Sequence, residues 1–200
     1  MRIVVGLGNP GSAYEATRHN VGFAVVEELA QRWRLPLGRT RGGVRMVHGP
    51  IAGQDVTLVE PQMYMNVSGV ALARMIPPVT AKDLVVVHDD LDLQCGSVRV
   101  KRGGGTAGHH GLDSIVECFE ADFTRVRVGI GRTPQGTATV DHVLSRFDAE
   151  ECEIISGALQ RAADAVECIL REGENNAMNR FNMRPRGSSV VATPAPSGRS

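Results

Sequence analysis

The N-terminal segment Met1–Phe23 constrains the fold of this chain more than any other part of it. A short apolar run, Ile3–Val5, is followed at once by a glycine-rich turn. Continuous β-branched runs are typical of strands buried in a parallel sheet, and glycines directly after a strand let the backbone turn tightly. The turn then delivers polar side chains at Asn9, Tyr14, Arg18, His19 and Asn20. The segment therefore predicts a buried strand whose end carries a polar site.

The rest of the sequence alternates predicted strands and helices. Strands are expected at Val44–Val47, Asp55–Val59, Asp83–His88, Ser97–Lys101 and Phe123–Ile130, and helices at Val21–Trp33, Val70–Met75, Leu112–Phe119 and Ala149–Arg171. Turns are expected at Gly49-Pro50 and Gly53-Gln54. This alternation predicts one α/β domain over residues 1–183, with a mixed, mostly parallel twisted sheet and helices on both faces. The Pro, Ser, Gly and Ala bias of residues 184–200 predicts a disordered tail.

The charge balance rules out attraction of a polyanion by the protein as a whole. Lys plus Arg and Asp plus Glu both number 22, so the net charge is zero and any polyanion must meet a local patch. One segment is locally basic and predicts a phosphate-binding patch, formed by Arg99, Lys101, Arg102, Arg125, Arg127 and Arg132.

Cysteine usage and hydropathy predict a cytoplasmic protein. The four cysteines are far apart and form no CxxC pair, and no charged-then-apolar leader stands at the start of the sequence. No apolar run approaches the roughly 20 residues of a membrane helix. We expect no disulfide framework and no membrane association.

The first turn satisfies the dinucleotide-binding pattern G-x-G-x-x-G, so that alternative has to be weighed. Two features argue against it. Pro10 removes a backbone N–H where a pyrophosphate would need donors, and the acidic residue expected about 20 positions later falls inside a helix, at Glu27 or Glu28. The glycines are better explained by the turn itself.

His19 is the strongest candidate for chemistry. It follows the polar turn, and Asp89 and Asp90 follow the other strongly apolar strand. Because the C-terminal ends of adjacent parallel strands meet at one edge of a sheet, either carboxylate could orient the His19 ring as a general base. No GxSxG motif is present and Cys95 has no adjacent base, so water is the expected nucleophile.

A metal centre and structural asparagines are the alternatives at this edge. His88, Asp89, Asp90, Asp92, His109 and His110 offer suitable atoms, but no strong ligand spacing such as HExxH occurs and successive strand residues point to opposite faces, so no metal is predicted. Asn9 and Asn66 could hydrogen-bond a developing oxyanion or a water, or could simply hold turns and helix caps.

Four separate blocks, in order, resemble the bacterial-type peptidyl-tRNA hydrolase family: VGLGNPGSAYEATRHNVGF, PQMYMNVSG, HDDLDLQCGSVRVKRGGGTAGHHGLDSI and RVRVGIGR, with a C-terminal MNRFN. The resemblance extends from Met1 to about Met183. It implies hydrolysis of the ester between a peptide and the terminal ribose of tRNA, which recycles tRNA from prematurely released chains. It implies peptidyl-tRNA as the partner, no cofactor, no metal and no protein partner. A monomer is expected because no dimerisation helix is evident.

The resemblance also implies roles for individual residues. His19 would activate water, and Asp89 would orient the His19 ring. Asn9 and Asn66 would hold the water, the substrate carbonyl or the terminal adenosine. The substrate cleft would be formed by Tyr14, Asn20, Tyr64, Met65, Gly108, His109 and His110. The tRNA 5′-phosphate would be bound by Lys101 and Arg127.

Three positions depart from the pattern usual in that family. His110 stands where an asparagine is usual, Glu60 where a lysine is usual, and Met63 where a threonine is common. The first departure predicts a shifted pH profile or altered substrate contacts.

Overall fold

A computed structural model describes residues 1–76 and 78–183 of the chain. The strands are β1 (Arg2–Gly6), β2 (Val44–Ile51), β3 (Gln54–Pro61), β4 (Leu84–Asp90), β5 (Val98–Arg102) and β6 (Thr124–Gly129). The α-helices are α1 (Val21–Arg32), α2 (Ser68–Met75), α3 (His110–Phe119), α4 (Thr139–Val143), α5 (Ala149–Glu172) and α6 (Glu174–Phe181). Short 3-10 helices occur at η1 (Arg18–Asn20), η2 (Met65–Val67) and η3 (Ala81–Asp83). The tail predicted over residues 184–200 lies outside the described residues.

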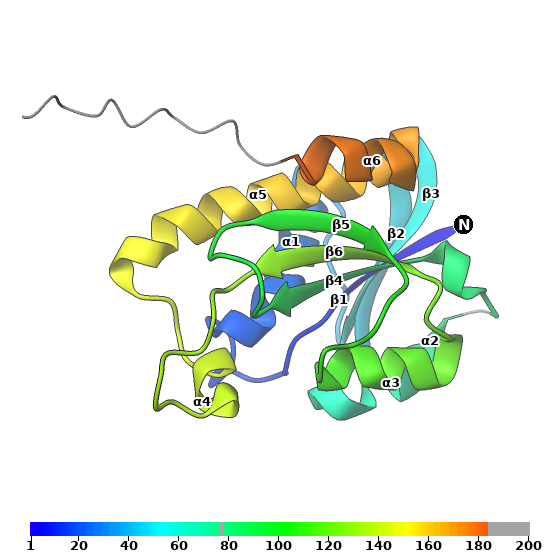
Figure 1. The fold of residues 1–200 in the computed structure, drawn as a ribbon. Helices are drawn as coiled ribbons and strands as arrows, with labels where there is room; N and C mark the ends of the chain where they lie inside the picture. Colours follow the sequence, from blue (N-terminus) through cyan, green and yellow to red (C-terminus); the bar gives the residue numbers. More distant parts are fainter. Residues whose placement is uncertain (77, 184–200) are drawn as a thin grey trace, which may run out of the picture.

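The six strands form one mixed sheet in the order β2-β3-β1-β4-β6-β5 (Figure 1). Strands β3, β1, β4 and β6 are parallel, whereas the two edge strands, β2 and β5, are antiparallel to their neighbours. The strands β1 and β4, which carry the two strongest apolar runs of the sequence, are adjacent at the centre. Their C-terminal ends therefore lie side by side, as the sequence predicts.

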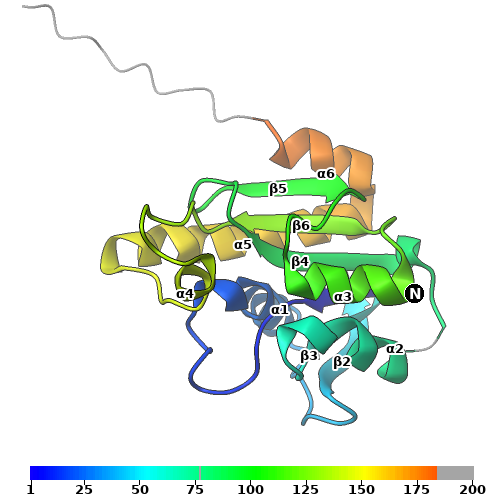
Figure 2. The same cartoon turned by 60° about the horizontal axis from the view of Figure 1, so that its bottom comes forward.

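Helices cover both faces of the sheet, and each face has its own apolar core. Helices α2 and α3 pack on one face around Ile3, Val5, Leu84, Val86 and Phe123. Helices α1 and α5 pack on the other face around Val4, Val85, Val87, Val126 and Val128. Figure 2 shows α2 and α3 in front of the sheet, with α1 and α5 behind it. Alternate residues of the same strands serve the two cores. The predicted α/β class, the mostly parallel sheet and the helices on both faces are confirmed.

The turn predicted at Gly49-Pro50 is wrong. Strand β2 continues through both residues to Ile51, which is fully buried, and the chain turns at Ala52-Gly53 instead. A Cβ at Gly49 would lie 2.5 Å from Leu35 Cδ2, so this glycine serves close packing within a strand. Pro50 is tolerated because β2 is an edge strand, where a missing N–H need not break the sheet.

Two helices were not predicted, and two others begin earlier than expected, α2 at Ser68 rather than at Val70 and α3 at His110. Helix α4 has a single buried residue, His142, and α6 buries only Ala177 and Phe181, so neither has the apolar periodicity that predicts a helix. Helix α3 begins at His110 rather than at Leu112, because His109 acts as its N-cap. Among residues 1–76 and 78–183, no helix combines the length and apolar character needed to cross a bilayer.

Two glycines bring the first helix close to the sheet. A Cβ on Gly22, at the start of α1, would lie 2.4 Å from Leu7 N and 2.5 Å from Val87 O. A Cβ on Gly6 would lie 2.2 Å from the carbonyl oxygen of Gly22. Both separations are far below van der Waals contact, so only glycine fits. The close approach brings η1, which immediately precedes α1, near the end of β4.

We predict that Gly22→Ala destabilises the protein by about 1–3 kcal/mol, because α1 must move away from β1 and β4 to accept the methyl group. The free energy of unfolding in urea measures this. Gly157→Ala is the matched control, since a Cβ there meets nothing within 4 Å in the middle of α5. That variant is expected to gain about 0.5–1 kcal/mol from helix propensity. Equal stabilities for the two variants would contradict the close-packing explanation.

Candidate active site

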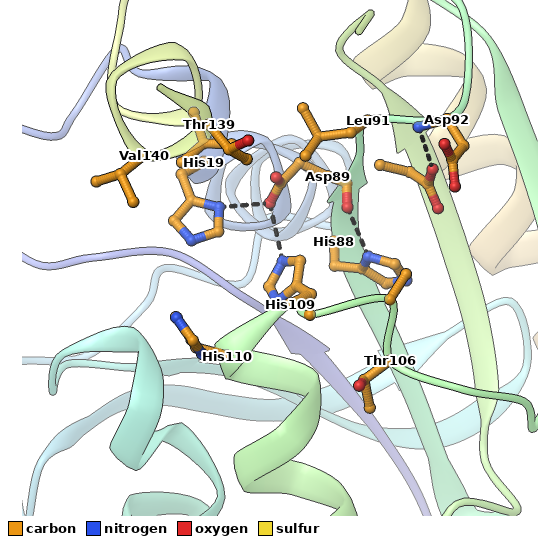
Figure 3. Close-up of a pocket in the computed structure, with 14 residues that line it drawn as sticks. His19, His88, Asp89, Leu91, Asp92, Thr106, His109, His110, Thr139 and Val140 are labelled. Carbon is orange, nitrogen blue, oxygen red and sulfur yellow. Dashed lines mark hydrogen bonds and ion pairs between the residues drawn. The ribbon is translucent and has the colours of Figure 1, made fainter. Parts of the chain in front are cut away.

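A cavity of about 390 Å³ opens at the C-terminal end of β4. Its floor and walls come from four places in the chain: η1, the end of β4, the loop and helix start around His109, and α4. Figure 3 shows the residues that line it, with the His19 and His109 rings both directed at Asp89. The cavity gathers residues that the sequence separates widely, including His19, Asp89, Gly108, His109 and His110.

The His19–Asp89 pair predicted from the ends of the two strands is present. His19 Nδ1 lies 2.8 Å from Asp89 Oδ1. Because a carboxylate only accepts hydrogen bonds, Nδ1 must carry the proton, which leaves Nε2 as the lone-pair nitrogen of neutral His19. Of the two carboxylates considered from sequence, Asp89 takes this position, whereas Asp90 pairs with Arg127. The side chains of His19 and Asp89 are 11% and 3% exposed, so the pair is nearly withdrawn from solvent.

Asp89 accepts a second hydrogen bond from another histidine. His109 Nε2 lies 3.0 Å from the same Oδ1 atom that His19 contacts. His109 Nδ1 accepts the backbone N–H groups of Gly111 and Leu112 at 3.2 and 3.3 Å, so it caps the N-terminus of α3. Burial alone would raise the pKa of Asp89, but the charge and hydrogen bond of His109, together with those of His19, hold it well below its usual range.

His88 lies beneath these two histidines and is neutral at physiological pH. Its Nδ1 donates to the Asp89 backbone carbonyl at 2.7 Å, and its ring meets the His109 ring edge-on with centroids 5.2 Å apart. Burial lowers the pKa of His88 to about 3, and the neighbouring charge of His109 adds to this effect. His88 is thus a neutral part of the cavity floor rather than a second acid or base.

Arg18 anchors η1 from the side opposite Asp89. Its guanidinium forms a two-armed ion pair with Glu151 at 2.6 and 3.0 Å and donates to Ser145 Oγ and Ile130 O. Its backbone N–H donates to Ser145 O at 2.9 Å. Ser145 follows α4, whose Thr139, Val140 and Val143 line the cavity. This network, which the sequence did not predict, connects the wall formed by α4 to the residue beside His19.

Asn9 and Asn20 hold the N-terminal turn. Asn20 uses its side-chain amide to bond both the backbone N–H and the backbone carbonyl of Asn9, each at 2.9 Å. Asn9 Oδ1 accepts the Met65 backbone N–H at 2.9 Å, which leaves its Nδ2 as the side-chain group available to a ligand. The substrate contact predicted for Asn20 remains a prediction, and the geometry favours a supporting role for this buried residue.

Asn9 lines a second cavity of about 260 Å³, next to Asn20 and Gln62. Met65, the partner of Asn9, lies close to His109, because a Cβ at Gly111 would lie 2.5 Å from Met65 Sδ and 3.1 Å from His109 Cε1. Met65 thus packs against the start of α3, beside His109. Asn9 therefore lines a different cavity from the one that His19 and Asp89 line.

The other residues predicted for the cleft are more exposed. Asn66 follows Met65 in η2 and is exposed, Tyr64 is 66% exposed, and Tyr14 is half-buried in the turn after Gly11. Gly108 has φ +77, which favours glycine at the bend before His109. The His110 side chain is 74% exposed at the cavity rim, with Nδ1 3.6 Å from Asp113 Oδ2. The roles of these residues remain predictions.

Most of the basic residues predicted to form a patch are held by other parts of the chain. Arg125 is buried and donates to the carbonyls of Gly104 and Gly105, and Arg102 pairs with Asp122 and Glu174. Arg127 Nε lies 2.7 Å from Asp90 Oδ2. Lys101 has no ion pair within residues 1–76 and 78–183.

Lys101 and Arg127 are diagonal neighbours on one face of the β5–β6 ladder, since Lys101 pairs with Arg125 and Arg99 with Arg127. Such residues have Cα atoms about 7–8 Å apart, so one phosphate could contact both side chains.

Only one group of side chains in the described part of the chain has the atoms for a metal ion: His19, Asp89 and His109, whose candidate atoms lie within 4.8 Å of one another. Both histidine nitrogens in this group already donate to Asp89 Oδ1. The contacts are therefore explained by hydrogen bonding to a carboxylate, and we assign no metal here.

Comparison with known proteins shows the family of the chain. The Peptidyl-tRNA hydrolase family model matches residues 3–189. The chain belongs to the peptidyl-tRNA hydrolase family. A peptidyl-tRNA hydrolase of Rubrobacter xylanophilus is 48% identical over 182 residues, which cover 90% of this chain and 99% of the relative. One from Roseiflexus sp. is 45% identical over 191 residues, covering 92% of this chain and 87% of the relative.

Solved structures of the peptidyl-tRNA hydrolase family share the fold. The peptidyl-tRNA hydrolase of Acinetobacter baumannii matches with a TM-score of 0.83 and 37% identity, over 91% of this chain and 94% of that one. A peptidyl-tRNA hydrolase in complex with N-propanol matches with a TM-score of 0.85 and 36% identity, over 94% and 97%. The resemblance noted in the sequence is confirmed, as is the prediction that the chain is an enzyme of this family.

The unusual Glu60 of this family member is buried at the end of β3, beneath α1. Its Oε2 lies 3.1 Å from Arg45 Nη1, and Arg45 also approaches Glu27 at 3.5 Å. Burial raises the pKa of Glu60 to about 8; Arg45 opposes the shift and Glu27 adds to it. The folded protein therefore keeps a proton on Glu60 at pH values where the unfolded chain has lost it.

We predict that Glu60 makes the protein less stable as pH rises from about 5 to 8. The pKa of Glu60 is higher in the folded protein than in the unfolded chain. Its contribution to stability is therefore complete below the pKa of the unfolded chain and is lost as the pH rises through the pKa of the folded protein. In Glu60→Gln this loss, on the order of 2–4 kcal/mol, should be absent. Urea unfolding at pH 5, 6.5 and 8 measures it, with Glu28→Gln, a half-buried glutamate that is ion-paired with Arg32, as control. Parallel pH dependence in Glu60→Gln and the unmodified protein would contradict the assignment.

Proposed function

We propose that the chain hydrolyses the ester bond between a peptide, or an N-blocked amino acid, and the terminal ribose of tRNA by direct attack of water. The observation that carries the proposal is the nearly buried His19–Asp89 pair, whose free nitrogen, His19 Nε2, belongs to a residue that lines the cavity. Family membership supports the substrate class. By this reaction the enzyme would return tRNA from prematurely released peptides to translation in the cytoplasm.

In this proposal His19 Nε2 takes a proton from water as the water oxygen attacks the ester carbonyl carbon. Asp89 keeps the imidazole in the required tautomer and stabilises the imidazolium that forms. When the tetrahedral intermediate collapses, the C–O bond to the ribose breaks and the imidazolium returns its proton to the ribose oxygen. The peptide leaves as a carboxylic acid, with no covalent bond to the enzyme at any stage.

Amide donors are suited to stabilise the negative oxygen of the intermediate. The Asn9 side-chain oxygen accepts the Met65 N–H, and its NH₂ group, which has no hydrogen-bond partner among the described residues, can donate to a carbonyl oxygen. Asn66, exposed on η2 one residue after Met65, is the second amide we assign to substrate or water. Asn9 is thus assigned to the carbonyl.

Lys101 and Arg127 are assigned to the 5′-phosphate of tRNA. Lys101 is exposed and without an ion pair in the described part of the chain, whereas Arg127 is shared with Asp90. A phosphate at Lys101 therefore gains a full positive charge, but at Arg127 it must compete with a carboxylate. We expect Lys101 to contribute more of the salt-dependent affinity.

Two rival functions predict different results. A non-hydrolysing RNA-binding relative would bind tRNA and leave N-blocked aminoacyl-tRNA intact. A metallohydrolase would lose activity on exhaustive chelation, followed by return of only the magnesium that tRNA folding needs. We include no metal, cofactor or protein partner in the proposal, and we expect a monomer.

We predict that His19→Ala lowers the rate of ester hydrolysis on N-acetyl-aminoacyl-tRNA by on the order of 10²–10⁴, because the general base is lost. Binding of the same tRNA, measured by filter retention, should change little. His48→Ala is the matched control, since His48, on the edge strand β2, forms a solvent-exposed pair with Asp55 of β3. Near-normal hydrolysis by His19→Ala would remove His19 from the role of base.

We predict that Lys101→Ala weakens tRNA binding and lowers the slope of log K against log salt by about 0.7–0.9, the value of one phosphate contact. Arg127→Ala should give a smaller change, because Asp90 already neutralises much of its charge. Arg102→Ala serves as control, since Arg102 is occupied by Asp122 and Glu174. An unchanged salt slope in Lys101→Ala would show that the phosphate is bound elsewhere.

A further inference from the structure

One oxygen atom of Asp89 accepts hydrogen bonds from two histidines that come from different elements. His19 Nδ1 is 2.8 Å from Oδ1 and His109 Nε2 is 3.0 Å from it, and the two rings are tilted with centroids 4.9 Å apart. His109 is 9% exposed at its side chain, as enclosed as the His19 ring. A residue that only contacted the peptide would not need to donate a hydrogen bond to Asp89.

We propose that His109 is a positioning residue, which fixes the Asp89 carboxylate and shares its hydrogen-bonding capacity with the base His19. The proposal rests on the proposed function, because it takes His19 as the base. His109 itself touches neither water nor the ester in this role. It acts through Asp89, and it is held in place by its own cap on α3.

The tautomer of His109 follows from its neighbours. The N–H groups of Gly111 and Leu112 can only donate, so His109 Nδ1 must present a lone pair. The Asp89 carboxylate can only accept, so His109 Nε2 must carry the proton. The start of α3 thus forces the tautomer that donates to Asp89.

Sharing Asp89 between two donors limits how strongly it stabilises protonated His19. If His109 no longer donates, the negative charge of Asp89 is left to His19 alone, and His19 holds its proton to higher pH. The acidic limb of the pH–rate profile should therefore move to higher pH when the donation from His109 is lost.

The other titratable groups around this trio remain the same in every variant. His88 and Asp90 come from β4, Asp92 from the loop after it, His110 and Asp113 from α3, Arg18 from η1, and Asp141 and His142 from α4. Arg18 is paired with Glu151, Asp90 with Arg127, and His142 bonds the Gly131 carbonyl. Differences between variants at position 109 thus report on the contact with Asp89.

Two substitutions of His109 separate its role as the N-cap of α3 from its hydrogen bond to Asp89. In His109→Asn a short side-chain oxygen can still cap α3, because Asn is among the best N-cap residues, but its amide is too short to reach Asp89. In His109→Gln the longer amide can take the place of Nε2 and donate to Asp89, but no acceptor remains at the position of Nδ1. The first variant keeps the cap, and the second keeps the donor.

The test is the pH dependence of kcat/KM on N-acetyl-aminoacyl-tRNA, with the melting temperature of each variant. We expect His109→Asn to melt near the unmodified protein, to move the acidic limb up by about 0.5–1 pH unit and to lower kcat several-fold. His109→Gln should melt lower but return the limb to within about 0.2 pH unit of its original position, since one pH unit corresponds to about 1.4 kcal/mol of differential interaction.

His48→Asn, the same change in an exposed His–Asp pair on β2, should leave the limb unchanged. An acidic limb that stays fixed in His109→Asn while KM rises would overturn the proposal and leave His109 as a contact for the peptide. A limb shifted equally in both variants would also overturn it. Failure of the proposed function is distinct, because His19→Ala would then retain turnover.

Discussion

A buried carboxylate at the end of the central strand β4 is the interaction on which the site depends. Asp89 is 3% exposed, and a charge withdrawn from water to this degree is tolerated only where donors replace the lost hydration. The donors come from η1, through His19, and from the start of α3, through His109. One oxygen atom thereby joins the strand to η1 and to the start of α3, so the positions of His19 and of α3 depend on each other.

The element that carries His19 is too short to hold itself. Helix η1 has three residues, and isolated turns of this length gain too few hydrogen bonds to offset their loss of conformational freedom. Tertiary contacts hold it from two directions: Asp89 bonds His19, and Glu151 and Ser145 bond Arg18. Gly22 completes the arrangement, because it lets α1 approach β4 closely enough for His19 to reach the carboxylate. The position of His19 is therefore set by contacts distant in sequence.

This explains which parts of the site the sequence could predict. The meeting of His19 and Asp89 follows from two apolar runs that become neighbouring parallel strands, a rule that needs no side-chain detail. The donation from His109 to Asp89 depends on the residue at which α3 begins, and the glycine-rich loop before it has no periodicity that fixes the boundary. The contacts of Arg18 depend on α4 and α5, and α4 buries too little to be recognised from sequence. Similarly, β2 passes through Gly49-Pro50 because Leu35 and the buried Ile51 hold it, which local turn propensity cannot report.

The charges around the cleft show how a neutral protein can present a positive site. Of the six basic residues that the sequence groups together, Arg102, Arg125 and Arg127 are tied to acidic side chains or backbone carbonyls, and Arg99 donates to Phe181 O. These contacts hold the β5–β6 edge and the loop Gly103–Gly105 in position beside the cavity. Lys101, without an ion pair in the described residues, then stands on a rigid ladder diagonal to Arg127. Under the proposed function, a few fixed charges would orient a phosphate without the strong general attraction of a basic surface, so a tRNA held this way could leave once its ester is cut.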